Sequence, residues 1–136
     1  MNFNHSLPIQ IRFNDIDLAG HVYNAVYQEY FDLARVDYFN KSLGNLINWK
    51  KTGLVIASIH IDYSIPILLT DKIEIRSKVS EMGNKSLEMI QDIIKIGDSE
   101  PAAVGKTILV CFDMQTRSSM EIPETWKEEI NRFEKS

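Results

Sequence analysis

The chain has 136 residues, of which 44% are hydrophobic and 25% charged, with a formal net charge of −4 and one cysteine, Cys111. The length suits one domain with a buried core, and the negative charge argues against a nucleic-acid-binding protein. No apolar run approaches the roughly 20 residues that span a bilayer. Residues 1–8 lack the basic segment and apolar core of a signal peptide, and a lone cysteine suits a reducing compartment. We therefore expect a single cytoplasmic domain over residues 1–136.

The first predicted element is a short strand. Ile9, Ile11 and Phe13 alternate with polar residues, which indicates one buried face. Pro8 fits at the start of this strand, where no ladder hydrogen bond is lost. A loop over residues 15–21 follows and contains two carboxylates, a glycine and a histidine. Ionisable groups that lead into a helix are a common setting for chemistry, so this loop is the candidate site.

A helix of about five turns is predicted from about residue 23 to residues 40–44, where Asn, Ser and Gly residues indicate its end. At about 100° per residue, the polar side chains fall in one narrow sector: Asn24, Gln28, Asp32 and Arg35. The apolar side chains cover a much wider arc: Tyr23, Val26, Tyr27, Tyr30, Leu33, Ala34 and Tyr38. This balance predicts a helix that other elements wrap on most of its sides.

Beyond residue 53 the hydrophobic period changes to two, which predicts four strands. They cover about residues 53–63, 72–79, 86–96 and 102–114. Residues 82–85 and 97–99 form two tight turns between them, so consecutive strands are antiparallel. In the first of these strands one face is predicted to be apolar: Val55, Ala57, Ile59, Ile61 and Tyr63.

A short amphipathic helix is predicted at the C-terminal end, where Pro123 suits a first helical position. Trp126, Ile130 and Phe133 then recur at helical spacing. The predicted fold is therefore α+β, an antiparallel sheet of about five strands that curls around one long helix. Its edges are free to pair with a second copy.

The segment Asp17-x-x-Gly-His-Val-x-Asn-x-x-Tyr27 resembles the signature of hotdog-fold thioesterases. The pair Ala34-Arg35 and the later pattern Asp62-Tyr-x-x-Pro-x-x-x-x-Asp71 also resemble this family, and the likeness spans about residues 9–114. It is closest to the 4-hydroxybenzoyl-CoA thioesterase-like group, which includes the Tol–Pal-associated acyl-CoA thioesterases. The resemblance implies hydrolysis of an acyl-CoA to free acid and CoA, with no metal or cofactor. It also implies a homodimer or homotetramer whose active site lies at a dimer interface.

The resemblance also implies roles for the loop residues. Asp17 matches the carboxylate that this group uses as nucleophile or general base. His21 matches a histidine of the plant acyl-ACP thioesterases, although Ala19 stands where those enzymes have asparagine. Asn24 stands where the Tol–Pal-associated enzymes usually have histidine. Asp17 and His21 are therefore the catalytic candidates, and the chemistry that His21 and Asn24 add is left open.

Thioester hydrolysis also needs donors for the developing oxyanion. A helix N-terminus offers free N–H groups and the positive end of the helix dipole. We expect the amides near Tyr23 and Asn24 to polarise the thioester carbonyl, and Tyr27 to line the substrate site or to belong to the core. Lys85 is a candidate for contact with the phosphates of CoA, although lysines beside turns are usually only solvated.

Other interpretations remain open. Asp17 also suits an Asx-turn or a helix N-cap. The alternative functions are an acyl-ACP thioesterase, a hotdog dehydratase, and a non-catalytic protein that binds acyl thioesters. Asp17 argues against a pure binding protein, which has no need of a carboxylate beside the thioester carbonyl.

Overall fold

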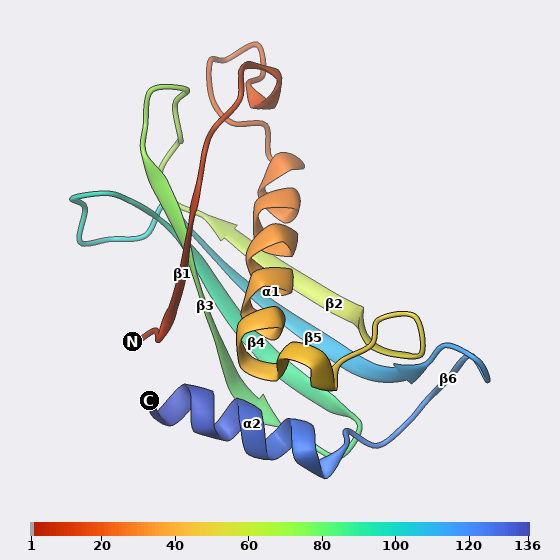
Figure 1. Ribbon diagram of the computed structural model, residues 1–136. Coiled ribbons are helices and arrows are strands. Elements are labelled where there is room, and N and C mark those ends of the chain that lie inside the picture. Colours follow the sequence, from red (N-terminus) through yellow and green to blue (C-terminus); the bar gives the residue numbers. More distant parts are fainter. Residues whose placement is uncertain (1) are drawn as a thin grey trace.

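The computed structural model describes residues 2–136 and shows one antiparallel sheet packed against a long helix (Figure 1). The elements follow in the order β1 (His5–Ile9), η1 (Phe13–Asp15), α1 (Val26–Leu43), η2 (Gly44–Leu46), β2 (Thr52–Tyr63), β3 (Ile73–Met82), β4 (Ser86–Lys95), β5 (Ala103–Asp113), β6 (Ser118–Ser119) and α2 (Glu124–Lys135). The spatial strand order is β1-β3-β4-β5-β2, and β6 pairs with β5. Every strand pair is antiparallel. The predicted α+β fold is confirmed.

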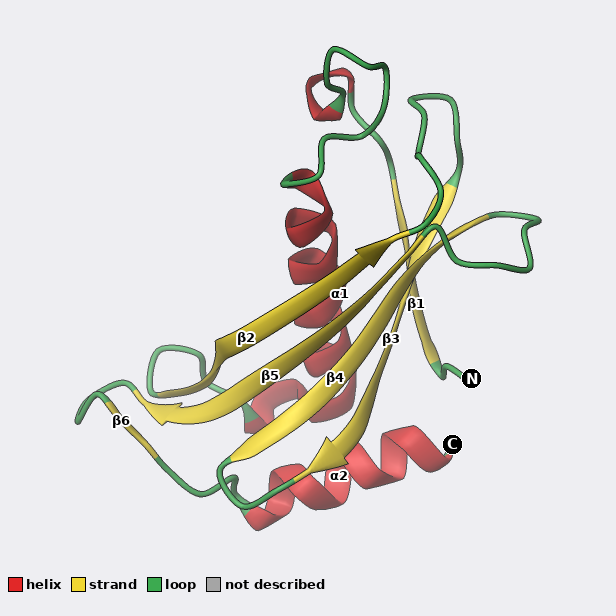
Figure 2. Ribbon diagram, turned by 180° about the vertical axis from the view of Figure 1, so that it is seen from behind, coloured by secondary structure: helices red, strands yellow, loops and turns green. Residues whose placement is uncertain are grey.

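The helix α1 crosses the strands on one face of the curled sheet, which Figure 2 shows from the opposite side. Its buried aromatic side chains divide between two apolar clusters. Tyr27, Tyr30 and Phe31 pack with residues from the ends of β3, β4 and β5 that lie nearest the start of the helix. Tyr38 and Phe39 pack with the opposite ends of these strands and with α2. The helix is therefore held along its whole length by the sheet, as its wide apolar arc predicts.

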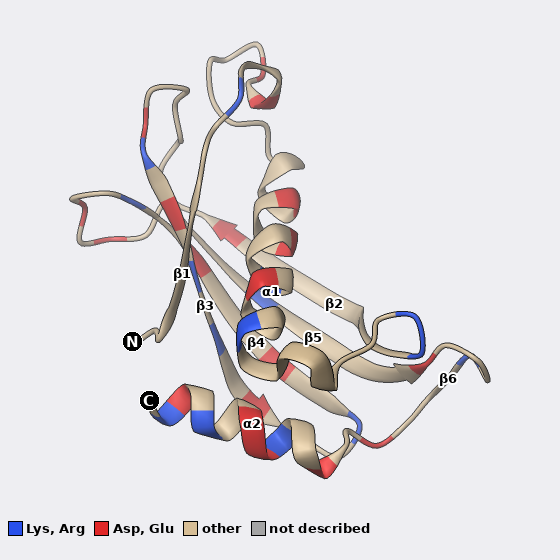
Figure 3. Cartoon of the chain, in the orientation of Figure 1, with Lys and Arg blue, Asp and Glu red and all other residues tan. Residues whose placement is uncertain are grey.

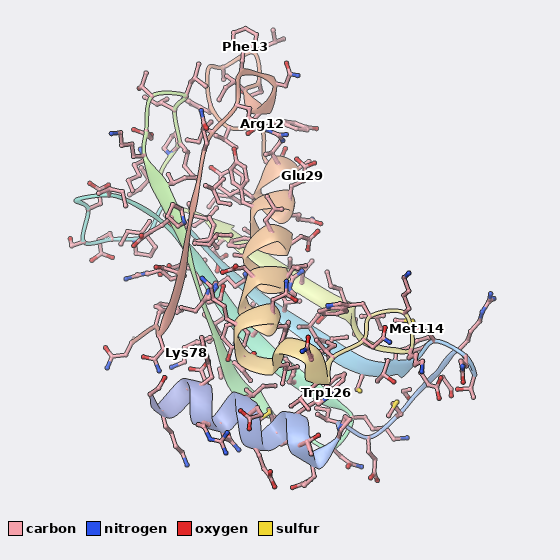
Figure 4. The ribbon with its side chains drawn as sticks, in the orientation of Figure 1. Arg12, Phe13, Glu29, Lys78, Met114 and Trp126 are labelled. Atoms are coloured by element: carbon pink, nitrogen blue, oxygen red, sulfur yellow. The ribbon has the colours of Figure 1, made fainter. Side chains whose placement is uncertain are left out.

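The short helix α2 closes the second cluster. Trp126 is buried beneath the C-terminal end of α1, where Figure 4 labels it, and its Nε1 donates to the carbonyl of Leu46 at 3.2 Å. Ile130 is fully buried and Phe133 packs at the edge of the cluster. The predicted amphipathic helix is confirmed. Within residues 2–136, no helix is both long and apolar enough to cross a membrane.

The first strand lies earlier in the chain than predicted. It ends at Ile9, and residues 13–15 form a 3-10 turn in which Phe13 is 81% exposed. Figure 4 shows Phe13 at the tip of this loop, away from the sheet. Pro8 lies inside β1 instead of at its start, which is possible because β1 is an edge strand. The alternation that placed Phe13 in the strand belongs to a loop.

A β-bulge in β2 divides its side chains between the two faces of the sheet. The register with β5 shifts between Ile56 and Ser58. After the shift, Ile59 pairs with the buried Thr107 on the helix side of the sheet, as predicted. Before it, Val55 pairs with Val110 and therefore lies on the opposite face, so its predicted place with Ile59 is wrong. The extra residue of a bulge reverses the alternation of a strand, and sequence period alone does not reveal it.

Candidate active site

The loop before α1 is fixed by Asp15, whose side chain is buried at 2% exposure. Asp15 accepts hydrogen bonds from the hydroxyl of Tyr30 at 2.7 Å, the backbone N–H of Arg12 at 3.0 Å and the guanidinium of Arg12 at 3.1 Å. Its carbonyl oxygen accepts from the N–H of Tyr23 at 2.8 Å. Asp15 therefore ties the start of the loop both to the first turns of α1 and to the residues that lead into the helix.

Ionisation of Asp15 is coupled to this anchoring role. Burial acts to raise the pKa of Asp15, but the hydrogen bonds from Arg12 and Tyr30 outweigh it and hold that pKa below its ordinary value of 3.8. Burial and the bond to this carboxylate raise the pKa of Tyr30 well above its usual range. Asp15 is thus a buried, ionised carboxylate that anchors the loop, and both of its side-chain oxygens already accept hydrogen bonds.

Asp17 lies two residues further on and is bound differently. Its Oδ1 accepts from the backbone N–H of Ala19 at 2.9 Å and of His21 at 3.2 Å. Its own N–H donates to the carbonyl of His21 at 2.8 Å, and the N–H of Gly20 donates to its carbonyl at 3.1 Å. The Asx-turn considered for Asp17 is therefore present. It uses only one carboxylate oxygen, and in residues 2–136 Oδ2 has no hydrogen-bond partner.

The turn depends on Gly20, which has a φ of 83°. This conformation is accessible to glycine at little cost and is strained for other residues. It allows the chain to fold back so that both N–H groups reach Asp17 Oδ1. Backbone conformation, and not close packing, accounts for the glycine, since a Cβ added at Gly20 would meet no atom within 4 Å.

A pocket of about 400 Å³ opens between the start of α1 and the end of β2. Its walls come from the loop, the first turn of the helix and the segment after β2: Asp17, His21, Val22, Tyr23, Asn24, Tyr27, Tyr63, Ser64, Ile65 and Pro66. Five residues singled out from the sequence therefore meet here: Asp17, His21, Tyr23, Asn24 and Tyr27. Figure 1 shows the loops at residues 10–25 and 64–72 at the same end of the molecule.

Lys85 does not join this group. It lies in the hairpin between β3 and β4, where its carbonyl accepts from the N–H of Cys111. Figure 2 shows this hairpin beside α2, at the end of the sheet opposite to the start of α1. Within one chain, Lys85 and the pocket therefore lie at opposite ends of the sheet.

The free amides at the start of α1 differ from those predicted. The N–H of Tyr23 donates to the Asp15 carbonyl, so it is not available to an oxyanion, and this part of the prediction is wrong. The next two amides, of Asn24 and Ala25, donate no hydrogen bond within residues 2–136. Both precede Val26, the first helical residue, and no side chain caps this end of the helix. Two unpaired N–H groups at the positive end of an 18-residue helix suit a developing negative charge.

Two tyrosines of the pocket wall contact each other. The rings of Tyr27 and Tyr63 meet edge to face with centroids 4.8 Å apart. The hydroxyl of Tyr63 donates to the carbonyl of Asn24 at 3.3 Å, which joins the end of β2 to the start of α1. Burial raises the pKa of Tyr27, and the nearby Tyr63 and Asp17 act in the same direction. Tyr63 was expected as an apolar strand residue and as part of the Asp62–Asp71 pattern, and neither expectation included its contact with the start of α1.

Solved structures share this architecture. A thioesterase from Thermus thermophilus, complexed with coenzyme A and Zn, matches with a TM-score of 0.85 and 31% identity over 98% of this chain and 96% of that chain. A probable thioesterase from Escherichia coli, YbaW, matches with a TM-score of 0.84 and 25% identity over 95% of this chain and 98% of that one. The curled sheet around one long helix, shared with these neighbours, defines the class as hotdog-fold thioesterases.

The family follows from the sequence comparison. The chain belongs to the thioesterase-like superfamily, whose family model matches residues 11–130, and it is a thioester hydrolase. The long-chain acyl-CoA thioesterase FadM of Escherichia coli K12 is 26% identical over 130 residues, 93% of this chain and 97% of that protein. The acyl-CoA thioesterase YbgC of Helicobacter pylori 26695 is 30% identical over 130 residues, 90% of this chain and 96% of that protein.

Proposed function

We propose that the protein hydrolyses acyl-CoA thioesters to a free acid and CoA, with Asp17 as the reacting carboxylate. The observation that carries the proposal is a pocket lined by Asp17 and by Asn24, whose backbone N–H and that of the adjacent Ala25 are unpaired at the start of α1. The substrate class is supported by the relatives named as acyl-CoA thioesterases and by the neighbour complexed with coenzyme A. The carbonyl oxygen of the thioester would accept from the two unpaired amides, and its carbon would face Asp17.

The hydrogen bonds of Asp17 suit this role. Two backbone N–H groups hold Oδ1, so the carboxylate is oriented without any long side chain to position it. Oδ2 is left for chemistry, and it can act in two ways. It attacks the carbonyl carbon and expels CoA as a thiolate, which leaves an acyl–aspartyl anhydride for water to hydrolyse. Alternatively it accepts the proton of a water molecule that attacks the same carbon.

The oxyanion donors lower the barrier in either route. Negative charge develops on the carbonyl oxygen as the tetrahedral intermediate forms, and fixed N–H groups stabilise it more than they stabilise the neutral thioester. CoA leaves as a thiolate, which is a good leaving group, so no strong general acid is required. His21 lines the pocket, and we propose that it contacts the substrate or the attacking water.

We further propose that the working unit is a homodimer paired through β2. β2 is the edge strand of the sheet next to the pocket, and residues 55–58 at its centre are exposed in the single chain. Its free backbone groups can continue the sheet into a second copy. The pocket lies at the end of this edge, so the second copy would form part of its wall.

A thiol-release screen tests the proposed function. Purified protein is incubated with short, medium and long aliphatic acyl-CoAs and with an aromatic acyl-CoA, and free CoA is measured with a thiol reagent. We expect turnover of at least one class. Tight binding of acyl-CoA without thiol release would instead favour a binding protein, and turnover restricted to acyl carrier protein substrates would favour an acyl-ACP thioesterase.

A further inference from the structure

The pocket has no cation of its own for the phosphates of CoA. None of its ten lining residues is lysine or arginine, and Asp17 is acidic. Of the basic groups at this end, Arg12 bonds to Asp15 and Lys95 forms an ion pair with Asp71 at 3.0 Å. The exposed Lys72 lines a different pocket, between β1 and residues 69–73. If the substrate is an acyl-CoA, as proposed above, its diphosphate and 3′-phosphate need cations from elsewhere.

A second copy paired through β2 would bring such cations to the pocket. Two copies related by a two-fold axis perpendicular to the sheet pair antiparallel at this edge. Full overlap of β2 with its equivalent sets Thr52 of one copy opposite Tyr63 of the other, with backbones about 5 Å apart. The residues just before Thr52 then lie beside Tyr63, Ser64 and Ile65, which line the pocket. Those residues are Lys50 and Lys51.

Lys50 and Lys51 lie beside the partner's pocket in more than one register of the β2 pair. Full overlap satisfies the largest number of free backbone groups on the edge and is therefore the favoured pairing. Sliding one strand by two residues in either direction still leaves Lys50 and Lys51 beside residues 62–67 of the other copy. Residues 62–67 include residues 63–66, which line the pocket at the end of β2.

The loop that carries these lysines is held in shape. The N–H groups of Lys51 and Thr52 both donate to the Asn48 carbonyl, and the N–H of Lys50 donates to Asn48 Oδ1 at 3.1 Å. Trp49 packs against Phe39 with ring centroids 6.2 Å apart. The N–H of Met114 donates to the Lys51 carbonyl at 2.9 Å, and Figure 4 labels Met114 beside this loop.

The side chains of Lys50 and Lys51, in contrast, are available to bind a ligand. Both are exposed, and in the chain from residue 2 onward neither forms an ion pair. Figure 3 shows their two positions as a blue segment of the loop at the start of β2.

Gly53 keeps the loop close to β2, because a Cβ there would lie 2.9 Å from Met114 Cε and 3.2 Å from the Trp49 ring. The loop is thus a fixed support for two free ammonium groups.

We infer that Lys50 and Lys51 of each protomer bind the phosphates of the CoA whose thioester lies in the other protomer's pocket. Each site then combines the Asp17 loop of one chain with the basic loop of its partner. The inference rests on the proposed function and on pairing through β2, and it assigns the phosphate contacts to Lys50 and Lys51 in place of Lys85.

The test compares two substrates that differ in the phosphorylated nucleotide. Kinetics are measured for an acyl-CoA and for the matching acyl-pantetheine, which lacks the nucleotide and all its phosphates. In the Lys50→Gln/Lys51→Gln variant we expect KM for acyl-CoA to rise about fivefold, with kcat and all constants for acyl-pantetheine little changed. The control is Lys127→Gln/Lys135→Gln, which removes the same charge from α2, at the end of the sheet opposite to the pocket.

A heterodimer tests whether the lysines act across the interface. Chains carrying Asp17→Asn are co-purified with chains carrying Lys50→Gln/Lys51→Gln under two affinity tags. If the lysines act in trans, one site keeps both Asp17 and the two lysines, so the heterodimer shows wild-type KM at half the wild-type kcat. If they act in cis, the only site with Asp17 lacks the lysines and KM stays raised, which overturns the inference.

The outcomes also separate the inference from the proposed function. If the wild-type protein hydrolyses neither acyl-CoA nor acyl-pantetheine, the proposed function is overturned and the inference with it. Wild-type turnover of both substrates, with an unchanged KM for acyl-CoA in the lysine variant, would overturn the inference alone.

Discussion

The two carboxylates of the loop before α1 are separated by one residue and have different tasks. Asp15 is buried and has three hydrogen-bond donors on its side chain. Asp17 borders the pocket and has donors on one oxygen only. The environment of each side chain, and not its residue type, therefore distinguishes an anchoring carboxylate from one that is available for reaction.

Substitution of Asp15 tests its role as an anchor. In Asp15→Asn, the amide oxygen can still accept from Tyr30 and from the backbone N–H of Arg12, but both bonds lose the negative charge of their acceptor, and the amide NH2 then faces the Arg12 guanidinium. We expect the free energy of unfolding to fall by about 1–3 kcal/mol, measured by urea denaturation at pH 7. An unchanged midpoint would contradict the anchoring role. The exposed Asp98→Asn, on the turn after β4, is the control.

The lowered pKa of Asp15 gives this effect a pH dependence. In the folded chain Asp15 stays ionised below its ordinary pKa of 3.8, so near that pH the unfolded chain binds more protons. The stabilisation is therefore complete above about pH 4 and is lost as pH falls further. We expect Asp15→Asn to flatten, but not abolish, the acid slope of stability, because the pKa values of Asp37 and Asp71 are also lowered. An identical acid slope in variant and wild type would contradict the assignment.

At the scale of elements, the closeness of α1 to the sheet depends on a glycine in β5. A Cβ at Gly105 would lie 3.0 Å from the ring of Phe31, which is fully buried. We expect Gly105→Ala to lower the free energy of unfolding by about 1–3 kcal/mol, because the helix or the ring has to move. The same change made in a Phe31→Leu background should cost less, since the ring is absent. Equal costs in the two backgrounds would show that the contact does not matter.

Sequence patterns predicted the elements well where one face of an element is buried against the core. The strands β3, β4 and β5 and both helices were found near their observed bounds. The short strand β1 was misplaced because an edge strand of five residues carries a weak pattern, and the adjacent loop continued the alternation to Phe13. The bulge in β2 depends on its pairing with β5, which is a long-range property that no local window contains.

Arg35 shows a further limit of pattern analysis. Its place in the polar sector of the helix indicates an exposed side chain, and it does form an ion pair with Asp32 in the same sector. Arg35 is nevertheless only 6% exposed, and its guanidinium also donates to Gln91 at 3.3 Å inside the sheet–helix layer. Conversely, Leu33 and Val36 lie on the open side of α1 and are 57% and 48% exposed. A polar partner in β4 allows the arginine to be buried, and helix periodicity cannot reveal it.

The sequence predicted which residues form the candidate site better than it predicted which backbone amides are free there. Five of the six residues predicted for the site belong to the loop motif, and all five line the pocket because they are close in sequence at the start of the helix. Lys85 was far from this segment in sequence and lies far from it in the fold. The choice between the Tyr23, Asn24 and Ala25 amides depended on the Asp15 carbonyl, whose position only the folded loop defines.

At the scale of the whole molecule, the proposed site requires a second copy of the chain at the β2 edge. Ala57 is the bulge residue at the centre of that exposed edge, so its equivalents lie close to the two-fold axis when β2 pairs with itself. We expect Ala57→Asp to bring two carboxylates together and to shift the protein from dimer to monomer in light scattering. Thioesterase activity should fall as the dimer is lost.

The control for that experiment is Ser119→Asp, which adds the same charge on the exposed strand β6. This variant should remain dimeric and active. A monomeric wild-type protein that turns over acyl-CoA would contradict the interface account, as would an Ala57→Asp protein that is monomeric and fully active.

The central claim is that Asp17 is the reacting group, and the Asp17→Asn variant tests it most directly. Asparagine keeps the Oδ1 acceptor for the Ala19 and His21 amides, so the loop and the dimer should be preserved while the reactive oxygen is replaced. We predict that kcat for the best acyl-CoA falls by about a thousandfold or more, with the melting temperature and scattering mass unchanged. Turnover within a few-fold of the wild type in this folded variant would contradict the account.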